Sequence, residues 1–123
     1  MHIDFDYQDD VCILRTKGRF ATGLDADYLR SKTDEIKKSG RRKVLADFSD
    51  VPYIDSTGIG FLVGVYTSVT NTLGGRFVIT GPNPRVREVL DLMRLSTVIP
   101  IMADEASGLA FLNAPAALSA ERD

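Results

Sequence analysis

Short apolar segments recur along the chain, and turn-forming residues separate them. Residues 3–7 and 11–16 alternate apolar with polar positions on either side of a turn at residues 8–10, which predicts a β-hairpin. Further short apolar segments predict single strands at residues 43–48, 76–80 and 98–102. The chain is therefore expected to begin with a hairpin and to continue with strands that are separated by longer segments.

These longer segments have the spacing of amphipathic helices. Residues 25–39, with Gly40 as a stop signal, and residues 104–112 predict two of them. Asn83 and Pro84 are typical of the cap and the first position of another helix. The inward stripe of that helix is expected to comprise Val86, Val89, Leu90 and Met93. Strands that alternate with helices over short links predict a single-domain α/β fold, with mostly parallel pairing after the hairpin.

The longest of these segments follows the third predicted strand and spans residues 51–73. Asp55 and Ser56 are both suited to cap a helix, so Ser56 is expected at a helix start. Gly74-Gly75 is expected to end that helix. Apolar residues at helical spacing predict its buried stripe, which comprises Ile59, Leu62, Val63, Tyr66, Thr70 and Leu73.

The opposite face of this helix is rich in small residues. It comprises Thr57, Gly60, Gly64 and Ser68, with Phe61 and Val65 beside them. Because a glycine inside a helix costs about 1 kcal/mol relative to alanine, these glycines require a physical reason. Either the helix packs closely on another element of the domain, or a partner approaches the helix start and contacts Phe61 and Val65. The residues alone leave both interpretations open.

The composition is that of one ordinary globular domain. The chain has 123 residues, of which 44% are apolar and 26% charged, and its net charge of −2 does not favour nucleic acid as a partner. Cys12 is the only cysteine, which excludes an internal disulfide and fits a buried thiol in a reducing compartment. The acidic N-terminus does not resemble a signal peptide, and no apolar run is long enough to insert into a membrane. We therefore expect a cytoplasmic protein.

The residues give little support to an enzyme. His2 is the only histidine and lies near the end of the chain, so a Ser-His-Asp arrangement around Ser56 is not expected. The surrounding motif also lacks the G-x-S-x-G frame of a nucleophile elbow. Acidic residues are scattered without a cluster of histidines or thiols, so we expect neither a metal site nor a cofactor. Gly58-Ile59-Gly60 lacks the complete fingerprint of a phosphate-binding loop.

Three motifs resemble those of the STAS domain of anti-sigma factor antagonists. They are the segment 47–62, which contains Asp55-Ser56-Thr57-Gly58-Ile59-Gly60, the turn Leu73-Gly74-Gly75-Arg76, and the helix opening Pro84-Arg85-Val86. The resemblance extends from about Val11 to Leu112. It implies a small mixed β-sheet with about four helices packed largely on one face. It also implies a domain at residues 1–112, which leaves residues 113–123 as a tail that we expect to be frayed.

The resemblance also implies a role for the helix start. In the family, the serine directly after the motif aspartate is phosphorylated, and Ser56 is its match in this chain. The implied partner is an anti-sigma factor with serine kinase activity that uses ATP, and a serine phosphatase would restore the hydroxyl. The protein would then regulate transcription by binding, as a substrate of the kinase and not as a catalyst. The residues expected to contact the partner are Asp55, Ser56, Thr57, Gly58, Gly60, Phe61, Gly64 and Val65.

A phosphate on Ser56 would switch this contact through its charge. It adds about −1.5 to −2 charges, which the positive end of a helix tolerates. Burying that charge unpaired against a partner would cost several kcal/mol. The alternative is that Ser56 only caps the helix, which is worth about 1 kcal/mol. With the surrounding motif, we favour Ser56 as the phosphate acceptor.

One position departs from the family pattern, and two other function classes stay open. Family members carry an acidic residue in the loop after the second strand, in a G-x-[LI]-D pattern, whereas this chain has Ala21 at that place in Gly18-Arg19-Phe20-Ala21. Some STAS-like domains are accessory subunits of signalling or lipid-trafficking assemblies and have no phosphorylation switch. The glycine-rich helix start could also hold a nucleotide or another anion.

Overall fold

The computed structural model describes residues 2–19 and 26–114, and in this part of the chain five strands form one sheet. Their order is β1-β2-β3-β4-β5; the first pair is antiparallel and the other three pairs are parallel. The strands are β1 (His2–Gln8), β2 (Val11–Lys17), β3 (Lys43–Asp50), β4 (Arg76–Thr80) and β5 (Ile101–Met102). The prediction of a mixed sheet that begins with a hairpin is therefore confirmed.

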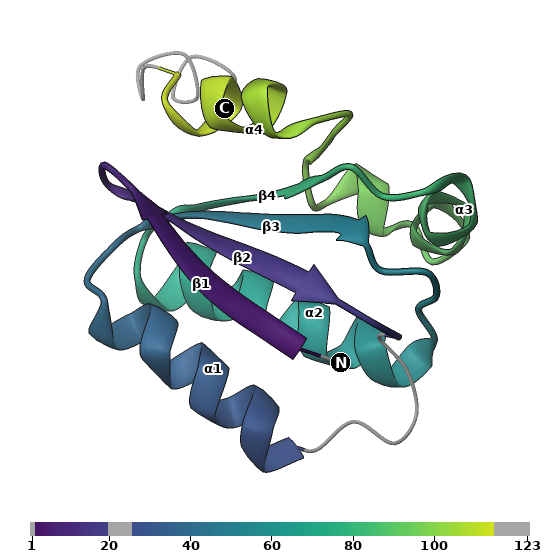
Figure 1. The fold of residues 1–123 in the computed structure, drawn as a ribbon, viewed down its shortest axis with the longest axis horizontal. Helices are drawn as coiled ribbons and strands as arrows, with labels where there is room; N and C mark the ends of the chain where they lie inside the picture. Colours follow the sequence, from purple (N-terminus) through teal and green to yellow (C-terminus); the bar gives the residue numbers. More distant parts are fainter. Residues whose placement is uncertain (1, 20–25, 115–123) are drawn as a thin grey trace.

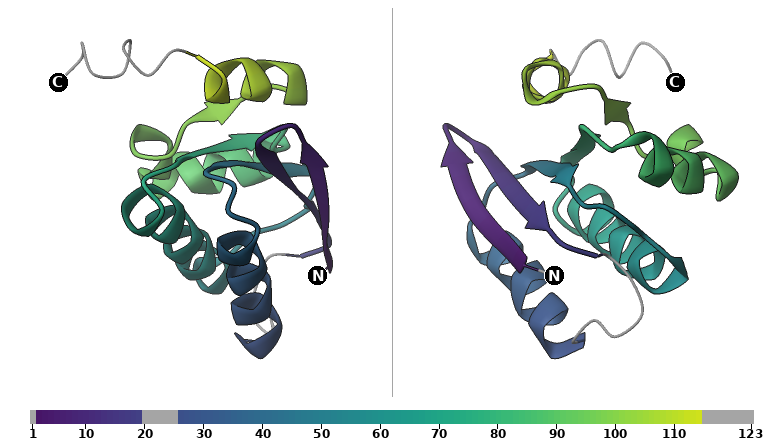
Figure 2. Two further views of the ribbon diagram at one scale, coloured as in Figure 1. Left: turned by 90° about the vertical axis from the view of Figure 1, so that its left-hand side faces the viewer. Right: turned by 45° about the vertical axis from the view of Figure 1, so that its right-hand side comes forward.

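Helices lie on both sides of this sheet (Figures 1 and 2). α1 (Ala26–Lys38) and α2 (Ser56–Thr67) lie against one face, and α3 (Pro84–Leu92) buries residues in the same, larger core. α4 (Glu105–Leu112) covers the opposite face and buries residues in a smaller core. The expected packing of the helices largely on one face is confirmed.

The sheet is buried on both faces because successive strand residues point into different cores. On β3, Val44 and Ala46 face the larger core, whereas Leu45 faces the smaller one. Cys12 on β2 lies in the larger core with no exposed surface, and this burial raises the pKa of its thiol to about 11. The buried position expected for Cys12 is therefore confirmed.

Three predictions about apolar segments are wrong. The buried stripe of α2 passes through Val65, which is 2% exposed, and leaves Val63 39% exposed. Apolar residues surround this helix, so its periodicity fits two adjacent stripes and does not choose between them. Met93, expected in the core, lies on the surface at the end of α3. The last strand is shorter than predicted: the backbone nitrogens of Val98 and Ile99 donate to the Leu95 carbonyl, so only β5 pairs with β4.

The structure describes the first two residues of the predicted tail, Asn113 and Ala114. The side-chain oxygen of Asn113 accepts a 3.0 Å hydrogen bond from Lys43 Nζ. The carbonyl oxygen of Ala114 accepts a 2.9 Å hydrogen bond from Arg76 Nη1. These two residues are thereby attached to the strands, and the rest of the predicted tail, residues 115–123, lies outside the described residues.

Two glycines allow the chain to return from α2 to the sheet, as the sequence predicts. α2 continues into a π-helical turn, Ser68–Thr72, and Gly74 follows with a φ of +65°. Gly75 approaches the backbone of Arg42 so closely that a Cβ atom would overlap the Arg42 carbonyl oxygen. That oxygen accepts a 2.8 Å hydrogen bond from the backbone nitrogen of Arg76. The first glycine therefore permits the turn, and the second permits the start of β4.

Replacing Gly75 by alanine is expected to lower the free energy of unfolding by about 1–3 kcal/mol, because the added methyl group displaces the Arg42 backbone. Urea unfolding followed by circular dichroism measures this loss. Gly64→Ala is the matched control, since a Cβ there meets nothing within 4 Å. Alanine at position 64 should leave stability unchanged or raise it by up to about 1 kcal/mol. Equal losses in the two variants would contradict the close approach at Gly75.

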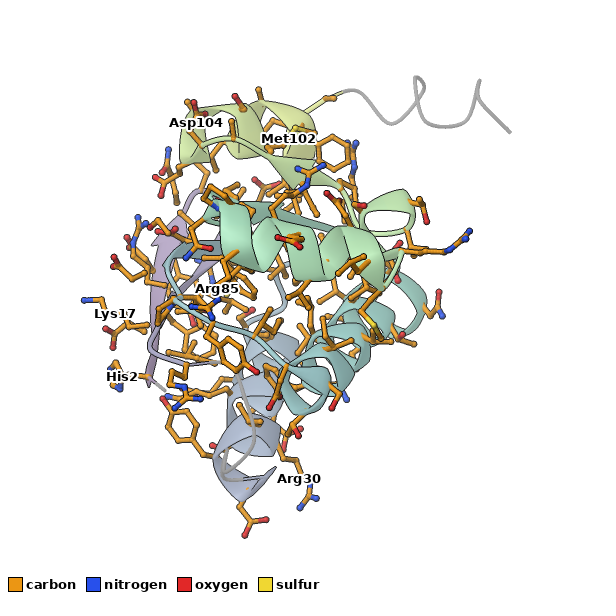
Figure 3. All side chains as sticks on the ribbon, turned by 90° about the vertical axis from the view of Figure 1, so that its right-hand side faces the viewer. His2, Lys17, Arg30, Arg85, Met102 and Asp104 are labelled. Atoms are coloured by element: carbon orange, nitrogen blue, oxygen red, sulfur yellow. The ribbon has the colours of Figure 1, made fainter. Side chains whose placement is uncertain are left out.

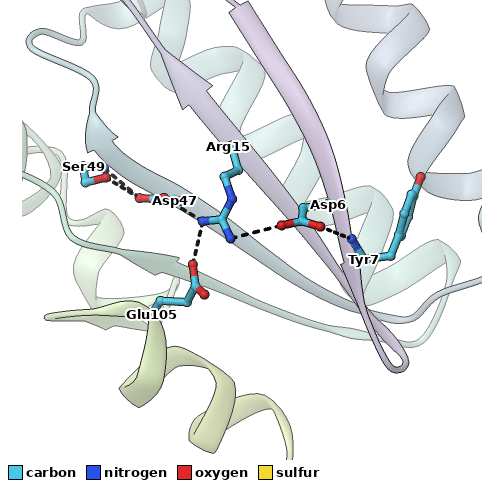
Figure 4. Close-up of polar contacts among 6 residues, drawn as sticks. All are labelled: Asp6, Tyr7, Arg15, Asp47, Ser49 and Glu105. Carbon is cyan, nitrogen blue, oxygen red and sulfur yellow. Dashed lines mark hydrogen bonds and ion pairs between the residues drawn. The ribbon is translucent and has the colours of Figure 1, made fainter.

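Arg15 links the hairpin, β3 and α4 through three carboxylates (Figure 4). Its Nη1 donates to Glu105 Oε1 at 2.6 Å and to Asp47 Oδ2 at 3.2 Å. Its Nη2 donates to Asp6 Oδ2 at 3.2 Å. These hydrogen bonds, above all the one to Glu105, raise the pKa of the Arg15 guanidinium above its ordinary value. No sequence motif indicates this cluster, because its members are far apart along the chain.

Arg15→Met is expected to lower the free energy of unfolding by about 1–3 kcal/mol, because three carboxylates then lie close together without their cation. Arg30→Met is the control in the same urea experiment. Arg30 pairs with Asp27 on the surface, where both side chains are mostly exposed, so its loss should stay below about 0.5 kcal/mol. A loss for Arg15→Met as small as that for Arg30→Met would show that the cluster does not stabilise the packing of α4.

Candidate functional site

α2 begins near the carboxyl end of β3, and Asp55 caps it. Asp55 Oδ1 accepts hydrogen bonds from the backbone nitrogens of Thr57 at 2.9 Å and Gly58 at 3.4 Å. The backbone carbonyl of Asp55 accepts a 2.9 Å hydrogen bond from Ile59. Ser56 is therefore the first helical residue, and its side chain is exposed. The predicted place of Ser56 at a helix start is confirmed, whereas the capping role belongs to Asp55.

Neighbouring segments hold this helix start in place. Ile54, just before the cap, and Ile59, in the first turn, are both buried. Asn83 joins the start of α3 to the same region: its Nδ2 donates to the Val51 carbonyl at 3.2 Å, and its Oδ1 accepts from Val86 N at 2.8 Å. The starts of α2 and α3 are thereby fixed near each other, at the sheet edge where open α/β folds commonly bind their ligands.

The residues predicted to contact a partner fall into three groups. Four of them are exposed, namely Ser56, Thr57, Gly60 and Gly64. Asp55 and Phe61 are half-buried, and Phe61 packs against the larger core. Gly58 and Val65 are buried. An apolar contact of a partner with Val65 was therefore a wrong prediction, because the side chain is covered by the domain itself; Val63 lies on the surface instead.

The structure tests one of the two interpretations of the glycines in α2, namely close packing within the domain. A Cβ atom at Gly60 or Gly64 would meet nothing within 4 Å. Close packing against another element therefore does not explain these two glycines within the described residues. The other interpretation, a partner that approaches this face, stays a prediction.

A cluster of two cationic side chains lies against the link that precedes α2. Arg19 follows β2, and Arg85 belongs to the first turn of α3. Both lie against Tyr53, with guanidinium carbons 5.2 Å and 5.7 Å from the centroid of the ring. Figure 3 shows Arg85 next to α3 on this side of the molecule. The three residues come from separate segments, so no sequence motif indicates the cluster.

Ala21, which stands where the family pattern has an acidic residue, lies outside the described residues.

The remaining candidates, namely His2, a metal site, a membrane-spanning helix and a cavity, do not involve the start of α2. His2 Nε2 is 2.7 Å from Asp4 Oδ1 on β1. Among the described residues, no group of three or more His, Cys, Asp and Glu side chains could hold a metal ion. In that same part of the chain, none of the helices combines the length and apolarity needed to cross a membrane. A cavity of about 210 Å³, lined in part by Tyr66 and Phe77, lies toward the end of α2 that is opposite Ser56.

Comparisons with known proteins agree with this architecture. A family model described as STAS domain matches residues 2–108. The Anti-sigma F factor antagonist of Paenibacillus polymyxa is 26% identical over 110 residues, which cover 89% of this chain and 92% of the relative. A shorter match, 38% identical over 68 residues, covers 55% of this chain and 59% of a Thermotoga neapolitana relative. The crystal structure of a "putative anti-sigma factor antagonist" from Thermotoga maritima has a TM-score of 0.82 at 26% identity and covers 89% of this chain and 93% of that one.

The assignment of the cap predicts different costs for two adjacent substitutions. Asp55→Ala should lower the free energy of unfolding by about 1 kcal/mol, because two backbone amides lose their acceptor. Ser56→Ala should change it by less than about 0.5 kcal/mol, because an exposed side chain in the first turn is replaced by a good helix former. Urea unfolding of both variants measures the difference. A larger loss for Ser56→Ala would assign the capping role to Ser56.

Proposed function

Because the chain belongs to the STAS domain family, we propose that it acts as an anti-sigma factor antagonist whose binding is switched by phosphorylation of Ser56. The observation that carries this proposal is the exposed hydroxyl of Ser56 at a helix start whose cap is supplied by another residue. A kinase can reach that hydroxyl without unfolding the domain. The names of the relatives support the same role.

The proposed binding surface is the start and outer face of α2. Ser56 and Thr57 are exposed there, and Gly60 and Gly64 present bare backbone that a partner can approach closely. Val63 supplies an exposed apolar side chain on the same helix. Unmodified protein binds an anti-sigma factor through this surface and thereby prevents it from inhibiting its sigma factor. This role places the protein in the cytoplasm, where transcription occurs.

Phosphorylation ends the interaction through charge. The anti-sigma factor, acting as a serine kinase, transfers the γ-phosphoryl group of ATP to Ser56 Oγ, and ADP and a proton leave. The product carries about −1.5 to −2 charges next to the Asp55 carboxylate, and covering both with a partner costs several kcal/mol. A serine phosphatase removes the phosphoryl group with water and restores binding. The fold is retained because Ile59, Leu62 and Val65 keep α2 anchored in the core.

The test uses the anti-sigma kinases of the source genome, each purified and incubated with this protein and ATP. We expect at least one to place a single phosphate on Ser56, which peptide mass spectrometry locates. We also expect the phosphorylated protein to bind that kinase at least tenfold more weakly than the unmodified protein, a difference of about 1.4 kcal/mol. Calorimetric titration measures both affinities.

Thr57→Ala is the matched control, because Thr57 is an exposed hydroxyl residue one position further along. This variant should still receive its phosphate on Ser56, even if its affinity for the kinase changes, whereas Ser56→Ala should bind the kinase and remain unmodified. Phosphate on Thr57, or equal affinities of the modified and unmodified proteins, would contradict the proposed switch. Binding without any phosphorylation would favour an accessory subunit that has no switch.

A further inference from the structure

We infer that Arg19 and Arg85, which lie against the ring of Tyr53, bind the phosphoryl group of phosphorylated Ser56. The inference deepens the proposed function, since it depends on Ser56 as the phosphate acceptor. It assigns to this chain a phosphate site that is assembled from three segments: the end of β2, the link between β3 and α2, and the first turn of α3.

The two guanidinium groups are free to bind an anion. Several other arginines of the chain are paired: Arg15 contacts three carboxylates, Arg30 pairs with Asp27, and Arg87 pairs with Asp91. Among the described residues, no ion pair or side-chain hydrogen bond engages Arg19 or Arg85, and both are exposed. Each guanidinium offers several N–H donors in the planar arrangement that matches a phosphate.

Tyr53 reduces the freedom of these long side chains. The half-buried ring lies within 5.2 Å of the Arg19 guanidinium carbon and within 5.7 Å of that of Arg85. Cation–π attraction and stacking of this kind restrict the rotamers without using the N–H donors. Part of the side-chain conformational entropy that the arginines would lose on binding an anion is therefore already lost before the phosphate is present.

Cations would stabilise a phosphate on Ser56 beyond what the helix start itself provides. Asp55 already accepts the backbone N–H groups of Thr57 and Gly58. The carboxylate of Asp55 also adds a negative charge directly beside the modified serine. The Asp55 carboxylate therefore offsets part of the favourable interaction with the helix terminus, and positive charge from outside α2 would stabilise the phosphoserine dianion further.

The arginines lie against the link that leads to Ser56. Tyr53 precedes Ser56 by three residues, and three extended residues span at most about 10 Å. The hydrogen bond from Asn83 to the Val51 carbonyl keeps the first turn of α3, which carries Arg85, next to this link. To contact the phosphoryl oxygens, either guanidinium would have to turn from the ring of Tyr53 toward Ser56.

The experiment uses full-length protein with phosphoserine installed at position 56 during translation. Phosphorus NMR during a pH titration measures the pKa of the second phosphate ionisation, which is ordinarily about 6. Paired guanidinium groups favour the dianion and lower this pKa. We expect the midpoint of the wild type to lie at least about 0.5 pH units below that of the double variant Arg19→Ala/Arg85→Ala. Asp55 and the helix terminus are the same in both proteins and cancel in the comparison.

Arg87→Ala is the matched control, since Arg87 lies on the same helix but pairs with Asp91 at 3.2 Å. Its titration should match that of the wild type, and Arg85→Lys should retain part of the shift. Circular dichroism checks that each variant is folded. Equal midpoints for the wild type and the double variant would overturn the inference. Equal midpoints together with weaker binding of the unmodified double variant to its kinase would assign the two arginines to the partner instead.

Failure of the phosphate site can be distinguished from failure of the proposed switch. If the phosphorylated wild type shows the lowered midpoint and still binds its partner as tightly as the unmodified protein, the switch is wrong and the phosphate site stands. If phosphorylation weakens binding but the midpoint is insensitive to both arginines, the switch stands and the phosphate site is wrong.

Discussion

The cap at Asp55 is the interaction on which the candidate site depends. Its carboxylate accepts the N–H groups of Thr57 and Gly58, and its carbonyl accepts that of Ile59, so the position at which α2 starts is fixed. Ser56 then occupies the first helical position and faces outward. If the serine itself were the cap, its hydroxyl would be engaged by the helix, and modification would remove a stabilising interaction. Because Asp55 is the cap, Ser56 can be modified with little loss in the stability of the fold.

The anchoring of α2 explains why a switch at this end is expected to act through charge and not through refolding. Buried side chains lie just before the cap at Ile54 and along the helix at Ile59, Leu62 and Val65. Releasing them from the core would cost several kcal/mol, which is comparable with the net stability of a domain of this size. A phosphate outside the core changes none of these contacts. Its effect is therefore confined to the surface potential and to what that surface can bind.

Local patterns predicted most of the fold, and contacts between distant segments account for what they missed. The hairpin, the Asn83 cap and the Gly74-Gly75 helix end follow from local rules of turn and cap chemistry. Local rules do not predict whether Val63 or Val65 is buried, because only the packing of α2 on the sheet decides it. The family motif likewise identified Ser56 at a helix start. It did not indicate the Arg15 cluster or the arginines at Tyr53, which exist only after distant strands and helices meet.

The glycines of α2 give an independent reason to regard its outer face as a binding surface. Each costs the helix about 1 kcal/mol relative to alanine. At Gly75, which follows the helix, the domain itself requires a glycine, because the Arg42 backbone leaves no room for a side chain. At Gly60 and Gly64 the space for a Cβ is open, so within the described residues nothing offsets the cost. Bare backbone that the domain does not use is most simply explained by contact from outside. The exposed line of Gly60 and Gly64 leads from the middle of the helix to Ser56, where a single phosphate would block that contact.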